Sequence, residues 1–117
     1  MKSGTDLINE AKSRIKEVSA ADALKKHAAG GVTFLDVRDQ QEVNLGRVPG
    51  AVHISRGTLE TKIEGAVPRD ADVVIYCASG NRSALVADTM QQMGYGKVSS
   101  LAGGFRAWAE AGGDIDG

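Results

Sequence analysis

The segment VVIYCASGNRS, residues 73–83, decides the fold that this 117-residue chain is expected to adopt. An apolar run rich in β-branched residues ends at Cys77, which is the only cysteine of the chain. Four residues separate Cys77 from Arg82, and Ser83 then begins a helical pattern. A short apolar run bounded by a glycine-containing loop is typical of a strand that is buried on both faces of a sheet. The segment therefore predicts a buried strand, a short loop and a helix over residues 81–93.

Strands and helices continue to alternate on both sides of this segment. Further strands are predicted near Val18 and over residues 32–37, 51–54 and 97–103. Further helices are predicted at the N-terminus with Thr5 as its N-cap, after Ser19, after Asp39, over residues 57–65 and over residues 105–112. Strands joined through helices run parallel, because each connection crosses back over the sheet. The expected fold is α/β, with about five strands in a mostly parallel sheet and helices on both faces.

The composition narrows the classes of function. The formal net charge is −1, so an extensive nucleic-acid-binding surface is not expected. No apolar run is long enough to span a membrane, and the charged N-terminal stretch lacks the apolar region of a signal peptide. The single cysteine and the separated His27 and His53 do not have the spacing of a zinc site. We therefore expect a cytoplasmic protein that binds neither nucleic acid nor membrane and needs no metal.

Cys77 has two interpretations, a structural cysteine of the core or a nucleophile. Free cysteines are often buried, which favours the first interpretation. The position of Cys77 at the end of a strand favours the nucleophile, because ligands bind beyond the carboxyl ends of the strands in an open parallel sheet. The start of the following helix and the guanidinium of Arg82 both favour a thiolate, and Gly80 lets the loop curl around the sulfur. We therefore interpret Cys77 as a nucleophile.

Three segments together resemble the single-domain rhodaneses, a family of sulfurtransferases. CASGNRS, residues 77–83, resembles the active-site loop of that family. FLDVRDQQEVNLGRVPGAVHIS, residues 34–55, resembles its early signature, and LAGGFRAWAEAG, residues 101–112, resembles its C-terminal signature. One departure is Arg47, where many members have histidine after the glycine.

The resemblance covers about residues 18–113. It implies a rhodanese-like domain over residues 18–117 and leaves residues 1–17 as an N-terminal helical extension.

The resemblance also implies a two-step reaction without a cofactor. The Cys77 thiolate takes the outer sulfur of a donor such as thiosulfate, releases sulfite and becomes a persulfide. A thiol, which includes a protein thiol, or cyanide in an assay then accepts that sulfur. The residues implied to bind the persulfide and the donor are those of the loop, Ala78, Ser79, Gly80, Asn81, Arg82 and Ser83.

Three further charged residues are candidates for the site. Arg56 follows a strand and is a candidate for binding an oxyanion of the donor, although a solvated surface arginine is the alternative. Asp36 and Arg38 flank the end of another strand, where we interpret them as a structural ion pair or loop anchor rather than as catalytic groups.

Two other classes of function remain open. One is a cysteine phosphatase or arsenate reductase of the same fold, but phosphatases that resemble it have five residues between cysteine and arginine, where this chain has four. The other is a relay module that carries a persulfide for one protein partner. The sequence does not separate this relay from a turnover enzyme, because it does not reveal the acceptor.

Overall fold

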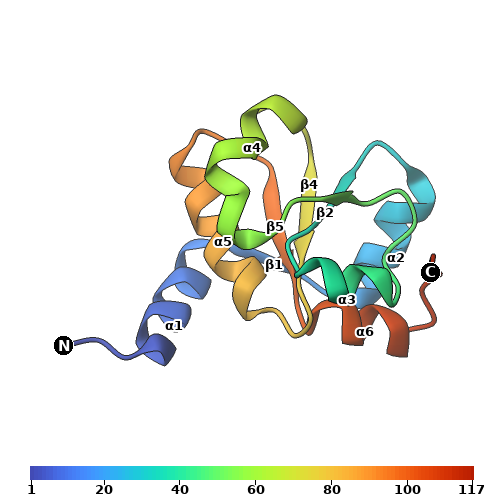
Figure 1. The fold of residues 1–117 in the computed structure, drawn as a ribbon, viewed down its shortest axis with the longest axis horizontal. Coiled ribbons are helices and arrows are strands. Elements are labelled where there is room, and N and C mark those ends of the chain that lie inside the picture. Colours follow the sequence, from blue (N-terminus) through green and yellow to red (C-terminus); the bar gives the residue numbers. More distant parts are fainter.

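The fold is built on one five-stranded sheet, and the computed structural model describes all residues 1–117. The strands are β1 (Lys16–Val18), β2 (Thr33–Asp36), β3 (Val52–His53), β4 (Val73–Tyr76) and β5 (Val98–Leu101). They lie in the order β1-β5-β4-β2-β3, and every neighbouring pair is parallel (Figure 1). The predicted α/β class and the number of strands are confirmed, and the sheet is wholly parallel.

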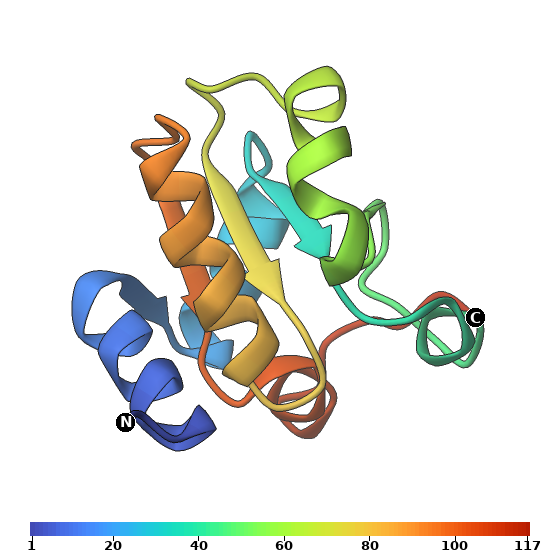
Figure 2. The same ribbon diagram turned by 60° about the vertical axis from the view of Figure 1, so that its left-hand side comes forward.

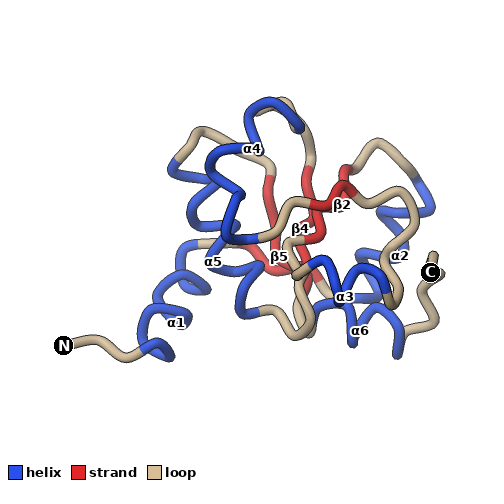
Figure 3. The backbone as a smooth tube through the Cα atoms, in the orientation of Figure 1, coloured by secondary structure: helices blue, strands red, loops and turns tan.

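Six α-helices connect and flank these strands. They are α1 (Gly4–Arg14), α2 (Ala20–Ala29), α3 (Gln40–Asn44), α4 (Leu59–Ala66), α5 (Asn81–Gln92) and α6 (Gly104–Glu110), with a 3₁₀ turn over Arg56–Thr58 before α4. No helix combines the length and the apolar character needed to cross a membrane. The tube in Figure 3 shows the strands at the centre and the helices around them.

The central strand β4 is buried on both faces, as its apolar run predicts. Val73 and Ile75 pack into a core with α4 and α5, whereas Val74 and Tyr76 pack into a second core that includes Trp108 of α6. Successive side chains of a strand point to opposite faces, so one continuous apolar run serves both cores. Figure 2 shows α4 and α5 together in front of the sheet, with α2 behind it.

The N-terminal helix packs on the outside of α5. The prediction of Thr5 as its N-cap is wrong: Ser3 caps the helix, because Ser3 Oγ accepts from the N–H of Asp6 at 3.1 Å. A bidentate ion pair at 2.8 and 3.0 Å joins Arg14 to Asp88 of α5. The expected boundary between residues 17 and 18 falls inside β1.

The carboxyl ends of the central strands meet at one edge of the sheet, where their arrowheads point in Figure 2. The backbone continues the ladder past the strand ends: the N–H of Val37 donates to the carbonyl of Tyr76 at 3.1 Å, and the N–H of Arg56 donates to Val37 at 3.2 Å. This edge therefore gathers the segments that carry Asp36, Arg56 and Cys77.

Candidate active site

The loop after β4 wraps around the sulfur of Cys77. The backbone N–H groups of Gly80 and Ser83 donate to Sγ at 3.1 and 3.3 Å. Gly80 makes this curl possible, because its φ of 107° lies in the left-handed region that other residues rarely adopt. A Cβ at this position would also lie 3.4 Å from the backbone nitrogen of Gly103. The local sequence thus aims two backbone donors at one sulfur atom.

Two buried hydroxyls extend this set of donors. Ser83 Oγ lies 3.4 Å from Cys77 Sγ and 2.8 Å from Oγ of Ser100 on β5. A thiolate has no proton to give, so in that state the Ser83 hydroxyl donates to sulfur and accepts from Ser100. The Ser83 hydroxyl is therefore placed as a donor to the sulfur.

Burial and hydrogen bonding act in opposite directions on the thiol. Only 1% of Cys77 is exposed, and burial raises its pKa because a charge is poorly solvated there. Hydrogen bonds from the Ser83 hydroxyl and from the N–H groups of Ser83, Gly80 and Ser79 lower the pKa by more, so it lies below its usual value. The loop therefore favours a buried thiolate.

The start of α6 supports the same loop from below. The N–H of Phe105 donates to the carbonyl of Cys77 at 2.7 Å, and the N–H of Arg106 donates to that of Ala78 at 3.3 Å. Gly104 permits this approach, because a Cβ there would lie 2.5 Å from the Cys77 carbonyl oxygen. Gly104 therefore lets the first turn of α6 come close enough to hold the loop in place.

Arg82 is engaged by a carboxylate that the sequence did not assign to the site. Its guanidinium donates to Glu42 of α3 at 2.7 and 2.9 Å, in a pair that is about one-third exposed on each side. The hydrogen bonds from Arg82 lower the pKa of Glu42 to about 2. The sequence signal for Glu42 was only its spacing from Asp39, whose N–H does donate to Glu42 Oε1 at 3.1 Å.

Asp36 and Arg38 form the predicted ion pair beneath the edge of the sheet. Both side chains are buried, and they approach to 2.7 Å. Arg38 also donates to the carbonyl of Gly46 at 2.7 Å, and its guanidinium carbon lies 4.4 Å from the ring centre of Phe105. These contacts tie the segment after β2 to the loop after α3 and to α6, which fits a structural role.

Among the remaining candidates, Ser79 acts on the sulfur through its backbone N–H. Ser79 and Asn81 are exposed, and Ala78 is half-buried. Arg56 is exposed and lines a surface cavity of about 240 Å³ between the 3₁₀ turn, the start of α4 and α5. Its role in donor binding stays a prediction.

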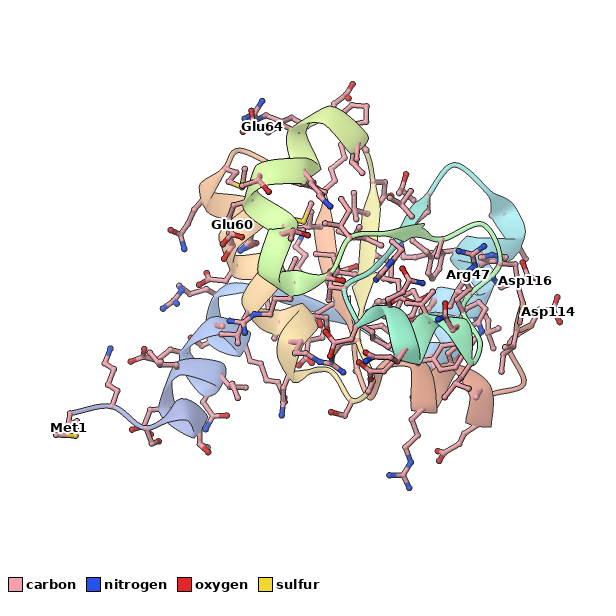
Figure 4. The ribbon with its side chains drawn as sticks, in the orientation of Figure 1. Met1, Arg47, Glu60, Glu64, Asp114 and Asp116 are labelled. Carbon is pink, nitrogen blue, oxygen red and sulfur yellow. The ribbon has the colours of Figure 1, made fainter.

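Arg47, where the sequence departs from the family pattern, is bridged to the C-terminal segment. It exchanges backbone hydrogen bonds of 2.8 and 2.9 Å with Asp116, and the two lie side by side in Figure 4.

Comparisons with known proteins agree on one family. The family model of the rhodanese-like domain matches residues 19–111. A protein from Allochromatium vinosum that carries the name sulfurtransferase is 38% identical over 81 residues, which is 69% of this chain and 75% of that one.

Two solved structures extend the comparison to the fold. A protein of unknown function from Rhodopseudomonas palustris, described as a possible tyrosine phosphatase, is 38% identical with a TM-score of 0.90, over 99% of this chain and 96% of that one. A rhodanese-related protein from Thermoplasma volcanium is 29% identical with a TM-score of 0.79, over 86% of this chain and 97% of that one.

Proposed function

Since the chain belongs to the rhodanese-like domain family, which supports sulfurtransferase activity in general, we propose that it moves a sulfane sulfur from thiosulfate or a similar donor to a thiol, or to cyanide in an assay. The observation that carries this proposal is the set of donors around Cys77 Sγ, two backbone N–H groups and one hydroxyl. These donors lower the pKa of the thiol and so supply the thiolate that attacks sulfur.

In the first step, the Cys77 thiolate attacks the outer sulfur of thiosulfate. The new sulfur–sulfur bond forms as the bond to the sulfonate breaks, and its electron pair leaves with sulfite. Cys77 becomes a persulfide whose outer sulfur carries the negative charge. The N–H groups of Asn81 and Arg82, in the first turn of α5, have no backbone acceptor and are free to bind that anion.

In the second step, a nucleophile takes the outer sulfur and restores the thiolate. With cyanide the product is thiocyanate, and with a thiolate it is a new persulfide. A covalent intermediate that separates the two half-reactions gives ping-pong kinetics. A relay to a single protein thiol uses the same chemistry and differs only in its acceptor.

Phosphatase chemistry is the second candidate, because the Rhodopseudomonas palustris relative is described as a possible tyrosine phosphatase. The loop argues against it in this chain. Four residues separate Cys77 from Arg82, and the loop already closes on the sulfur with only 1% of Cys77 exposed. A phosphoryl group brings three equatorial oxygens that must also be surrounded by donors. A persulfide adds a single atom.

The test measures both activities on the same preparation. We expect thiocyanate to form from thiosulfate and cyanide with ping-pong kinetics, and hydrolysis of an aryl phosphate to be negligible. Cys77→Ser should abolish thiocyanate formation while its circular dichroism spectrum stays that of the wild type. Hydrolysis of the aryl phosphate through Cys77 that is faster than thiocyanate formation would replace the sulfurtransferase proposal with the phosphatase one.

A further inference from the structure

The charge at the mouth of the Cys77 loop is balanced by acidic residues. Arg82 lies in the first turn of α5, where the positive end of the helix dipole disfavours a cation. It is held there by both carboxylate oxygens of Glu42, at 2.7 and 2.9 Å. Glu42 is itself fixed by the N–H of Asp39 at 3.1 Å.

A second carboxylate acts on the same guanidinium. Asp39 caps α3 and interacts electrostatically with Arg82, as does the sulfur of Cys77. Arg82 and the two carboxylates that act on it, Glu42 and Asp39, therefore carry one positive and two negative charges. An incoming donor meets an arginine whose charge is already balanced.

We propose that Glu42 is a specificity-determining residue, which by holding Arg82 disfavours dianionic sulfur donors such as thiosulfate relative to donors that carry a single negative charge. This inference rests on the proposed function, and it names the class of donor for the same site. A guanidinium held in a bidentate carboxylate pair has fewer free N–H groups for a second oxyanion. The cost of bringing a charge to this mouth also grows with the charge of the donor.

The favoured class includes organic thiosulfonates, which carry a single negative charge, and the same argument covers protonated organic persulfides, whose reacting group carries none. With a thiosulfonate, the Cys77 thiolate takes the outer sulfur, and the electron pair of the broken bond leaves on a sulfinate. With a protonated persulfide, the outer sulfur transfers with its proton and the electron pair leaves on a thiolate. Both steps balance without an oxidant or reductant.

The experiment compares two donors that differ in charge but share the same kind of breaking bond. We measure kcat/KM for thiosulfate, a dianion, and for benzenethiosulfonate, a monoanion, with cyanide as acceptor. Glu42→Gln should raise the ratio of kcat/KM for thiosulfate to kcat/KM for benzenethiosulfonate by roughly threefold to tenfold. The reason is that removing one negative charge from a partly exposed site favours a dianion more than a monoanion.

Glu64→Gln is the matched control. It also removes a carboxylate from an arginine pair, with Arg69 at 3.0 Å, but it lies at the far end of α4 from the start of α5 (Figure 4). This variant should leave the ratio unchanged. Asp39→Asn is the second variant, because asparagine still caps a helix while the charge is lost. It should shift the ratio in the same direction as Glu42→Gln.

The inference is overturned if Glu42→Gln leaves the ratio at the wild-type value, whether the two kcat/KM values are unchanged or fall by the same factor. The proposed function fails in a different way. A wild-type protein that transfers sulfur from neither donor overturns that function, and the inference falls with it. If the wild type is active and Glu42→Gln has the same ratio as the wild type, only the role of Glu42 is refuted.

Discussion

Replacing Ser83 with alanine tests whether hydrogen bonds, rather than Arg82, set the ionisation of Cys77. The Ser83 hydroxyl lies 3.4 Å from Sγ and is the largest single influence that lowers the pKa of the thiol. Its removal leaves burial, which raises the pKa, opposed mainly by the backbone N–H groups of Ser83, Gly80 and Ser79. The pKa of Cys77 should therefore rise in Ser83→Ala.

The size of the rise follows from the geometry. A hydrogen bond to a charged group is worth about 1.5–3 kcal/mol. A separation of 3.4 Å places this one at the lower end of the range. Since roughly 1.4 kcal/mol corresponds to one pH unit, the pKa should rise by about one pH unit. Ser100→Ala should give a smaller rise, because Ser100 acts only through its 2.8 Å contact with Ser83.

The assay is the rate of alkylation of the single cysteine as a function of pH. The midpoint of the wild-type profile should lie below the free-thiol value of about 8.5. Ser99→Ala is the control, because Ser99 neighbours Ser100 but points to the opposite face of β5. A Ser83→Ala midpoint equal to that of the wild type would refute the reasoning.

Four further results are expected. Gly104→Ala should lower the free energy of unfolding in urea by roughly 2–5 kcal/mol, because position 104 combines a left-handed φ of 60° with a backbone clash. Gly65→Ala, at an exposed glycine with open space around it, should not lower it. Equal stabilities of the two variants would contradict the close contact at Gly104. Asp36→Asn leaves a buried arginine without its carboxylate and should cost about 3–5 kcal/mol, and a loss below about 1 kcal/mol would contradict the burial. Arg82→Ala should move the alkylation midpoint less than Ser83→Ala does, and a larger shift would show that Glu42 does not neutralise the arginine. Because the thiol pKa is lower in the folded state, wild type should gain stability over Cys77→Ser as pH rises from the folded-state pKa to above about 8.5, and a gain on acidification would have the wrong sign.

The fold was predictable because its signals are local. The apolar run over residues 73–76 and the alternation of strands with helices were enough for a parallel sheet with helices on both faces. The predicted N-cap of α1, Thr5, was wrong by two residues, although the capping box of Ser3 and Asp6 can be recognised in the sequence. Two hydroxyl residues compete there, and the spacing to an acidic residue distinguishes them.

The geometry of the candidate site was predictable only where its residues are contiguous in the chain. Cys77 and the loop that follows it are one segment, so their proximity needs no tertiary information. Glu42, Ser100 and Gly104 come from α3, β5 and α6, and each reaches the loop only through the order of the strands. Arg56 shows the converse limit. Strand order brings its backbone to the correct edge, but its side chain is exposed and makes no hydrogen bond that would fix it toward the loop.

The central claim, that Cys77 carries the transferred sulfur, is tested most directly by intact mass spectrometry. Incubation with thiosulfate or benzenethiosulfonate should make the wild-type protein heavier by one sulfur atom. Cyanide should then remove the added mass and release thiocyanate. Cys77→Ser should gain no mass with either donor. Thiocyanate formation without an adduct on the wild type, or an adduct of the same mass on Cys77→Ser, would contradict the account.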